Sequence, residues 1–399
     1  MIHIVIGTNY GDEGKGMSTA YLTQYQRVVS GKTPIIVRYS GGAQSGHTVN
    51  GIVHHQVGSG NGDTYLHKTF LVNFLLLQKE VGVLTEIGQK PGIIWINENA
   101  GITTPYDVFI NQVKETLRGD GRHGSCGLGI WESVSRPEKL TVWDLYNLNY
   151  GTVEEKASGN YKRFMQSLKD SGVSLPEQFQ DIDIKAAFRD YIRAANDLLN
   201  SKVIRVIKDT KDSLNGILEG KDLIFESSQG LKIDPDLGDS NQDYNTPTSV
   251  SSYIPLLLVS FLGRTDEIRT WYVTRTFFTR HGNGPFPTED ATLCDKFSDA
   301  TNKPNEWQGT LRMGTWDKAA FESSISSDRA FYKRVSNKAR VGYAITYGVE
   351  TDFKFLTKSG LEDLEVENTS ILLFNGRDVK SGRVFENYSG EVSNLATYL

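Results

Sequence analysis

A short segment near the start of the chain combines glycines, two acids and a lysine at a spacing that suits phosphate chemistry. The segment GDEGKG, residues 11–16, lies between an uncharged β-branched run at 2–6 and a helical pattern over 17–29. Glycines let backbone N–H groups approach phosphate oxygens, and the start of a helix adds a favourable dipole. The lysine supplies a point charge, whereas the acids would repel phosphate unless a cation or a proton transfer explains them. We therefore predict a phosphate loop in which an acid takes part in the chemistry.

The loop differs from the common nucleotide-binding loops. In a Walker loop four residues separate the first glycine from the Gly-Lys pair, whereas six separate Gly7 from Gly14 here. Gly16 stands where a Walker loop has the serine or threonine that binds magnesium. A nicotinamide-dependent oxidoreductase would need GxGxxG and an acid about 20 positions later, and neither is present. The plainer alternative is a Gly-rich turn with a solvated acidic tip.

The elements that must position this loop alternate between strands and helices. Short runs rich in β-branched residues predict buried strands at residues 2–6, 34–39, 92–96, 223–226, 267–275 and 341–346. Apolar residues spaced three and four apart predict helices between them, most clearly over 186–207. This alternation favours an α/β fold with a mainly parallel central sheet and helices on both faces. Because no stretch has the composition of a linker, we expect residues 1–399 to form a single elaborated domain.

Composition limits the functional classes. The 399 residues include 43 basic and 48 acidic side chains, and a net charge of −5 gives no basic footprint for nucleic-acid binding. The longest apolar runs, at 70–77 and 253–262, are shorter than the roughly 18–20 residues of a membrane span. Cys126 and Cys294 are too few for a disulfide framework, which favours a reducing cytoplasm. We therefore expect a cytoplasmic enzyme with small-molecule substrates and with neither a membrane nor a direct nucleic-acid partner.

Seven motifs, in a fixed order, resemble those of the adenylosuccinate synthetase family. GDEGKG is the signature of that family, and six further motifs are spread over most of the chain. They are VRYSGGAQSGHTV (37–49), HHQVGSG (54–60), HGSCGLGIWESVSR (123–136), FESSQG (225–230), TRHGNGPFPTE (279–289) and NEWQGTLRMGTWD (305–317). The resemblance implies a P-loop-NTPase-like fold and a ligase that joins L-aspartate to C6 of a 6-oxopurine nucleotide through a 6-phosphoryl intermediate.

The same resemblance assigns chemical roles to individual residues. Asp12 is implied as the base that removes the purine N1 proton and as a ligand of Mg²⁺. Gly46 is implied as a second Mg²⁺ ligand through its carbonyl oxygen. His47 is implied as the general acid at the transferring phosphate, and Gln229 as a catalytic residue that reaches the base or the phosphate.

The remaining assignments concern the three substrates. The predicted triphosphate-binding residues are Asn9, Gly11, Glu13, Gly14, Lys15, Gly16, Gly46, Thr48, Thr346, Tyr347, Asn375 and Gly376. The predicted purine-monophosphate residues are Asn9, Asp12, Gln44, Ser125, Arg136, Gln229, Thr248 and Gly282. The predicted aspartate-binding residues are Gly309, Thr310 and Arg312. Arg136 matches an arginine that in the family crosses to the partner's site, which implies a homodimer.

Three departures from the family pattern bear on the substrates. The guanine-reading Thr-Lys-x-Asp of the family becomes TYGV at residues 346–349, which favours ATP or dATP over GTP as the donor. Thr310 replaces an arginine that touches the ribose 2′-hydroxyl in the family, and this loss suits a deoxynucleotide. The chain is also shorter than typical bacterial members, and we expect the NG turn at 375–376 to be what remains of a second base-contacting loop.

These departures resemble the phage branch of the family, the 2-aminoadenylosuccinate synthetases. That resemblance implies dGMP as acceptor, ATP or dATP as donor, and synthesis of 2-aminoadenine precursors for DNA in a host cytoplasm. Asp12 favours the alternative, an adenylosuccinate synthetase that uses IMP, because members of the phage branch can carry a small hydroxyl residue there. A non-catalytic nucleotide-binding regulatory module is the alternative from another class, and it would have little use for His47 together with Arg312.

Overall fold

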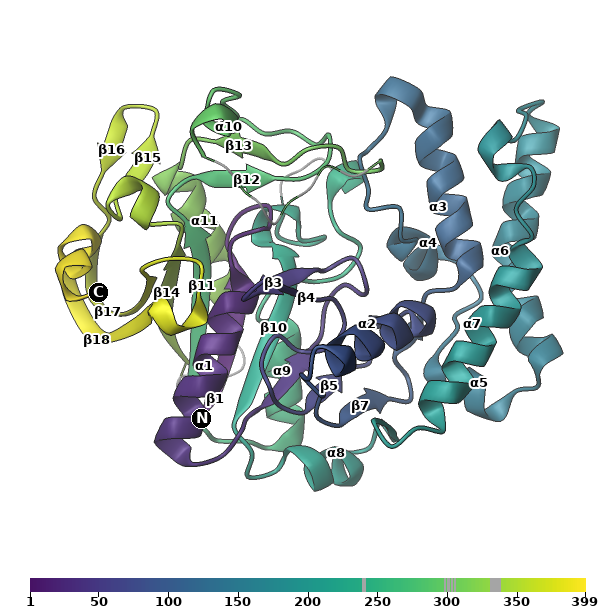
Figure 1. Cartoon of the computed structure of the whole chain (residues 1–399), viewed down its shortest axis with the longest axis horizontal. Coiled ribbons are helices and arrows are strands. Elements are labelled where there is room, and N and C mark those ends of the chain that lie inside the picture. Colours follow the sequence, from purple (N-terminus) through teal and green to yellow (C-terminus); the bar gives the residue numbers. More distant parts are fainter. Residues whose placement is uncertain (239–241, 298, 300–301, 303, 305, 331–338) are drawn as a thin grey trace.

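The computed structural model of the chain describes residues 1–399 except 239–241, 298, 300–301, 303, 305 and 331–338. Within the described residues, a ten-stranded sheet runs through the molecule (Figure 1). Every neighbouring pair in it is parallel apart from the last two strands. In order across the sheet the strands are β9 (Ile204–Ile207), β7 (Ile94–Asn97), β5 (Thr64–Leu66), β2 (Ile35–Arg38), β10 (Leu223–Gly230), β1 (Ile2–Gly7), β11 (Ile268–Arg275), β14 (Ala339–Thr346), β17 (Glu365–Phe374) and β18 (Gly382–Glu391).

Helices cover both faces of this sheet. Ile2, Ile4 and Ile6 of β1 pack in an apolar cluster with α8 (Lys211–Leu218), α9 (Tyr253–Leu262) and α11 (Lys318–Arg329). Val5 packs with α1 (Lys15–Ser30) on the opposite face. The predicted α/β fold with a mainly parallel sheet is therefore confirmed. None of the described helices is both long and apolar enough to cross a membrane. The helices are α1 (Lys15–Ser30), α2 (Phe74–Glu86), α3 (Pro105–Arg118), α4 (Ile130–Ser135), α5 (Val142–Asn147), α6 (Tyr150–Asp170), α7 (Ile184–Leu199), α8 (Lys211–Leu218), α9 (Tyr253–Leu262), α10 (Leu293–Lys296) and α11 (Lys318–Arg329).

The predicted helix over residues 186–207 is wrong in its last part. α7 ends at Leu199, and after a break the chain forms β9, the edge strand of the sheet. The sequence of β9 is IRVI, and β-branched side chains favour a strand over a helix. The six predicted strands each coincide with a strand of the main sheet.

Four two-stranded ribbons lie outside the main sheet, and two of them carry predicted site residues. They are β3 (His47–Val49) with β4 (Ile52–His54), β6 (Leu71–Val72) with β8 (Gly101–Ile102), β12 (Phe278–Arg280) with β13 (Arg312–Gly314), and β15 (Phe355–Thr357) with β16 (Gly360–Glu362). β3 begins at His47 and β13 at Arg312. The phosphate loop follows β1 at the carboxyl edge of the main sheet, which is where open parallel sheets bind ligands.

The C-terminal segment completes the sheet as a long hairpin. β17 and β18 pair antiparallel, and the turn after β17 contains Gly376 with a φ of 134°, a value that favours glycine. Val392 and Leu395, beyond β18, are buried in the same apolar cluster as β1. The C-terminal segment therefore contributes two strands to the main sheet and several side chains to its core.

A buried acid in the core gives the fold a pH dependence. Asp328 in α11 accepts hydrogen bonds from the Ser252 backbone N–H and the Tyr272 hydroxyl, both at 2.8 Å. Burial raises the pKa of Asp328 to about 6. A raised pKa in the folded state stabilises the protein fully below pH ~4, and that contribution is lost as the pH rises through about 6. We expect Asp328→Asn to remove this loss, up to about 3 kcal/mol, from urea unfolding curves measured between pH 4 and 7.

Candidate active site

Residues in left-handed backbone conformations shape the phosphate loop. Gly11, Asp12 and Gly14 have φ angles of 112°, 59° and 91°. Glycine adopts such angles freely, and aspartate tolerates the left-handed region better than most side chains. Gly14 is the N-cap of α1, whose first N–H groups have no partner within the helix. The loop can therefore present several N–H donors to one phosphate.

Glu13 is buried inside the loop, which accounts for one of its two acids. The Asn9 backbone N–H donates to the Glu13 carboxylate at 2.6 Å, and the Lys15 ammonium lies 3.9 Å from it. Burial raises the pKa of Glu13 to about 7, although Lys15 and Asn9 oppose that rise. Burial also lowers the pKa of Lys15, against the attraction of Glu13. Glu13 therefore holds the loop together from within instead of repelling phosphate at its mouth.

His47 on β3 is held by Glu226, a buried carboxylate in the middle of β10. Its Nδ1 lies 2.6 Å from Glu226 Oε1; the Ser59 hydroxyl donates to the same carboxylate, and the Arg38 guanidinium lies 3.5 Å away. Burial opposes the ionisation of Glu226, but Arg38 and His47 outweigh it and lower the pKa of Glu226 to about 2. Burial lowers the pKa of His47 to about 4 despite this carboxylate. The ionised Glu226 accepts a hydrogen bond from Nδ1–H of His47, which leaves Nε2 for a substrate.

A bulge at the end of β10 aims Gln229. Val5 of β1 pairs with Glu226, but the next pair is Gly7 with Gly230, so β10 contains extra residues at this point. Gln229 takes up part of the irregularity with a φ of 64°. Such bulges re-aim side chains and are common beside active sites.

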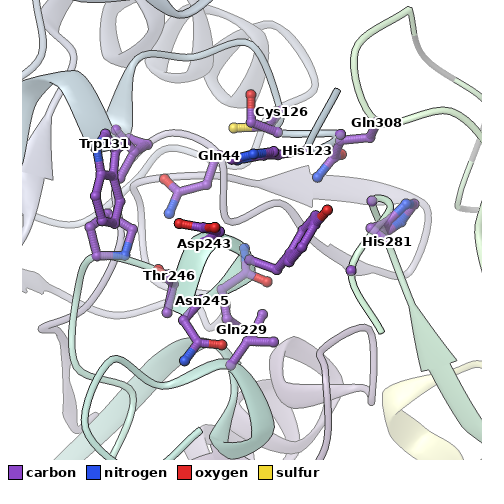
Figure 2. Close-up of a pocket in the computed structure, with 18 of the residues that line it drawn as sticks. Gln44, His123, Cys126, Trp131, Gln229, Asp243, Asn245, Thr246, His281 and Gln308 are labelled. Carbon is purple, nitrogen blue, oxygen red and sulfur yellow. The ribbon is translucent and has the colours of Figure 1, made fainter. Parts of the chain in front are cut away.

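Two cavities meet beside Gln229. The first, which we call the loop cavity, has a volume of about 430 Å³ and is lined by residues 12–17, residues 43–48 and the segment around Tyr347. The second, the side cavity, has a volume of about 270 Å³ and is lined by residues 123–126, 243–247 and 280–282 (Figure 2). Among the described residues, both linings contain Gln44, Cys126, Gln229, His281 and Gln308. This arrangement suits a reaction in which a group passes between two ligands.

Asp12 and His281 lie together where the two cavities meet. Asp12 Oδ2 is 3.2 Å from His281 Nε2, and the Asp12 side chain is 25% exposed to the loop cavity. The Arg275 Nε donates to the Asp12 carbonyl oxygen at 2.5 Å, which fixes the backbone of the loop. A carboxylate in this place can accept a proton from a ligand whose reactive edge enters from the side cavity.

Comparison with known proteins shows which family has these features. The family model described as Adenylosuccinate synthetase matches residues 4–328. The chain belongs to the adenylosuccinate synthetase family. The adenylosuccinate synthetase of Lacticaseibacillus paracasei is 27% identical over 336 residues, which cover 80% of this chain and 72% of that protein. The adenylosuccinate synthetase of Chlorobaculum tepidum is 29% identical over 348 residues, which cover 81% and 73%.

Two solved structures of similar enzymes share the fold. The fully ligated adenylosuccinate synthetase from Plasmodium falciparum has a TM-score of 0.61 at 18% identity, covering 99% of this chain and 89% of that one. The succinoaminodeoxyadenylate synthetase of cyanophage S-2L, solved with dGMP and with dATP as energy donor, has a TM-score of 0.55 at 15% identity, covering 97% and 95%. At these identities the likeness concerns the fold. Membership of the synthetase family makes this protein a C–N bond-forming ligase that joins aspartate to a purine nucleotide with a nucleoside triphosphate as donor.

Most of the predicted triphosphate-binding residues line the loop cavity. They are Glu13, Gly14, Lys15, Gly16, Gly46, Thr48, Tyr347 and Gly376. Within the described lining, the other four predicted residues, Asn9, Gly11, Asn375 and Thr346, do not appear. The Thr346 hydroxyl donates to the Glu13 carbonyl at 2.8 Å, and the Asn9 amide donates to the Thr8 hydroxyl at 2.9 Å. These two side chains support the loop in this structure, and their direct contact with a nucleotide stays a prediction.

Four predicted purine-monophosphate residues line the side cavity, namely Gln44, Ser125, Gln229 and Gly282. Thr248 is turned elsewhere, because its hydroxyl accepts a hydrogen bond from the Gly41 N–H at 2.8 Å. Its neighbour Thr246 lines the side cavity and offers a hydroxyl in its place (Figure 2).

Arg136 is buried within its own chain in this structure, and its role at a partner's site stays a prediction. Its side chain is 1% exposed, and Nη1 donates to Asp107 at 2.5 Å. Nη2 donates to the Ile102 carbonyl at 2.6 Å. Removing one partner of such a buried pair costs about 3–5 kcal/mol, which holds the guanidinium inside its own chain.

Arg312 already has a carboxylate partner. Its Nε donates to Glu289 at 2.8 Å and its Nη2 to the other oxygen of the same carboxylate. Its Nη1 donates to the carbonyl oxygens of Gly282 and Gly284, both at 2.8 Å. A substrate carboxylate would therefore have to replace Glu289 on the guanidinium.

The rest of the predicted aspartate loop also lies beside the cavities. Gly309, Thr310 and Arg312 are absent from both described linings, whereas Gln308 belongs to both. Asn305, the first residue of the motif, lies outside the described residues. Binding of aspartate by this loop stays a prediction that would require the loop to move.

Arginines surround Tyr347 at the far end of the loop cavity. The Arg275 guanidinium carbon lies 3.9 Å from the centre of the Tyr347 ring, and that of Arg377 lies 5.2 Å from it. Arg275 at this distance covers one face of the ring through a cation–π contact. A donor base stacked on Tyr347 would use the ring face that Arg275 does not cover.

Three residues with evident roles in this geometry were not predicted. Glu226 orients His47, His281 contacts Asp12, and Arg275 covers Tyr347. Glu226 and His281 lie inside recognised motifs, so both residues could have been chosen as candidates from the sequence. Their contacts with His47 and Asp12 could not be predicted, because each partner is far away in the sequence.

The oxygens of Asp12 and Gly46 suit a magnesium ion. Both residues line the loop cavity, and Mg²⁺ in nucleotide enzymes is usually held by one or two carboxylates together with phosphates and water. Within the part of the chain that the structure describes, no group of three or more His, Cys, Asp and Glu side chains could hold a metal by itself. Asp12 and Gly46 would therefore share the ion with substrate phosphates.

Proposed function

We propose that this synthetase joins L-aspartate to C6 of dGMP, using ATP or dATP and Mg²⁺, to give 2-amino-2′-deoxy-N6-succinyladenylate, ADP or dADP, and phosphate. The observation that carries the proposal is Val349, which is 46% exposed and lines the loop cavity where the family has its guanine-reading aspartate. The cyanophage enzyme that shares this fold was solved with dGMP and dATP, which supports the same pair here. The product would be a precursor of 2-aminoadenine in DNA.

The proposed chemistry uses residues at both cavities. Asp12 removes the N1 proton of guanine, and O6 attacks the γ-phosphorus as its bond to the β–γ bridging oxygen breaks. In the empty site the His47 ring is neutral with its proton on Nδ1, so we propose that the negative charge of the bound triphosphate brings a second proton onto Nε2. The protonated ring then donates through Nε2 to the transferring phosphate, and the negative Glu226 balances its charge. The amine of aspartate then attacks C6, and phosphate leaves. Bound Mg²⁺ would neutralise and orient the phosphates.

The acceptor and donor can be tested together by phosphate release with Mg²⁺ and L-aspartate. We expect the highest kcat/KM with dGMP and ATP or dATP, and lower values with GMP, IMP or GTP. Turnover with IMP alone would favour the second candidate, an ordinary adenylosuccinate synthetase, for which the retained Asp12 speaks. No turnover with any pair would favour a nucleotide-binding regulatory module.

A substitution at Val349 tests the donor assignment. Val349→Asp restores a carboxylate that can accept hydrogen bonds from guanine N1 and N2, so the kcat/KM ratio of GTP to ATP is expected to rise about tenfold or more. Val349→Asn has the same shape without the charge and serves as the control. Glu350 already lines the cavity but lies 3.7 Å from Arg377. An unchanged ratio in Val349→Asp would contradict this reading of the donor site.

We further propose a cytoplasmic homodimer built from single-domain chains. The main sheet takes strands from both ends of the chain, which supports one domain over residues 1–399. Cys126 and Cys294 are both free, which suits a reducing compartment. Because Arg136 is buried, the dimer rests on the family alone, and light scattering of the purified protein would test it.

A further inference from the structure

We propose that His281 and Asp12 together read the N1–C2 edge of the acceptor purine and favour a 2-amino group there. This inference rests on the proposed function, because dGMP carries the 2-amino group and IMP does not. It assigns to His281 a role in substrate choice, and it gives the retained Asp12 a reason that does not depend on IMP.

A closed ring of side chains holds His281 against Asp12. The Asn302 amide nitrogen donates to Asp299 at 2.9 Å, which turns the Asn302 oxygen toward His281 Nε2 at 3.2 Å. Asp299 also accepts from Arg275 Nη2 at 2.8 Å, and Arg275 Nε donates to the Asp12 carbonyl. The ring closes through the 3.2 Å contact between His281 and Asp12.

The contacts of His281 fix which ring nitrogen carries the proton. Nε2 faces two oxygen acceptors, on Asp12 and on Asn302, so the proton belongs on Nε2. Nδ1 is buried and has no hydrogen-bond partner among the described residues. An Nδ1–H without an acceptor would cost more free energy at this buried position than an unprotonated Nδ1, because buried donors almost always have partners. His281 is therefore a donor to Asp12 through Nε2.

Asp12 can still accept two more donors side by side. An ionised carboxylate has about four lone-pair sites, and His281 takes one of them on Oδ2. Guanine presents its N1–H and a 2-amino N–H next to each other along one edge, which matches the two oxygens of a carboxylate. Hypoxanthine presents N1–H alone. The pair therefore binds guanine through one more charge-assisted hydrogen bond than hypoxanthine.

The position of the pair suits this role. His281 belongs to the linings of both cavities, and Asp12 belongs to the loop cavity. A purine in the side cavity must bring O6 to the γ-phosphate in the loop cavity, so its N1 edge must pass this boundary. Without the His281 donor the Asp12 carboxylate loses the contact that fixes its orientation. We expect its hydrogen bond with the 2-amino group to be lost before its hydrogen bond with N1–H.

The test compares dGMP with dIMP, which differ only in the 2-amino group. Wild type, His281→Gln, His281→Asn and His281→Ala are measured for kcat/KM with both nucleotides, and for Kd by calorimetry without triphosphate or Mg²⁺. We expect wild type to prefer dGMP by about tenfold or more, since a site built around a hydrogen bond discriminates strongly. Gln can place an N–H where His281 has Nε2 and should keep the preference. Asn and Ala cannot, and their dGMP-to-dIMP ratio should fall to within about threefold.

The ratio separates substrate reading from simple support. If His281→Ala lowers kcat/KM equally for dGMP and dIMP, or if wild type does not distinguish them, the inference is overturned. If wild type turns over no 6-oxopurine nucleotide, the proposed function fails instead. Should His281→Ala lower the melting temperature strongly, the comparison of Gln with Asn at this position decides the question.

Discussion

Asp12→Asn is expected to lower kcat for phosphate release about 1000-fold, because a general base contributes about 10²–10⁴ in rate and an amide cannot take the N1 proton. Asn keeps the shape of the side chain and tolerates the φ of 59° at this position, so the loop itself should survive. The Kd of the acceptor nucleotide should also rise, by about tenfold or more, because an amide offers one oxygen in place of the two that we propose accept from guanine N1–H and the 2-amino group. Steady-state phosphate release and calorimetry with dGMP measure the two quantities.

Asp352→Asn is the matched control for this substitution. Asp352 also has a left-handed backbone, with a φ of 50°, and it is absent from the described linings of both cavities. Its kcat should equal that of wild type. If Asp12→Asn kept more than about a tenth of wild-type kcat, Asp12 would not be the base, since general-base loss costs at least about 10².

The phosphate loop could be predicted from the sequence because its determinants are local. A buried strand, a glycine-rich turn and a helix follow one another within residues 2–30, and each is encoded by its own residues. The role of Glu13 could not be predicted in the same way. Both acids of the loop lie next to each other in the sequence, and only burial distinguishes the internal Glu13 from the partly buried Asp12.

Long-range pairs account for most of what the sequence did not reveal. The partner of His47 is 179 residues away, and the partner of Arg136 is 29 residues away. A motif identifies an arginine or a histidine but not the carboxylate that pairs with it. The motif assigned Arg136 to a partner's site, but it could not reveal the buried pair that Arg136 makes with Asp107.

The prediction of one helix over residues 186–207 was wrong for a related reason. Apolar spacing continues through residues 186–207, so periodicity alone gives no end to the helix. The helix ends because residues Ile204–Ile207 form an edge strand that pairs with β7. That pairing depends on strands distant in the sequence, which a local pattern does not contain.

His47→Ala is expected to lower kcat about 100-fold or more, and its effect should be coupled to Glu226. Glu226→Gln keeps an oxygen that can accept the Nδ1 proton but removes the charge that balances a protonated ring, so kcat should fall about tenfold. Arg38 loses its buried ionic partner in this variant, and the free energy of unfolding should drop by about 3 kcal/mol. Urea unfolding measures that cost separately from kcat.

The double variant decides whether Glu226 acts through His47. If it does, His47→Ala with Glu226→Gln should have the kcat of His47→Ala alone, because the charge no longer has a ring to balance. If the two losses of kcat instead multiply, to about 1000-fold in the double variant, Glu226 contributes by another route, such as its contacts with Ser59 and Arg38. The same cycle measured on the Kd of ATP should show little coupling, because the proposed charge pair matters only while phosphate is being transferred.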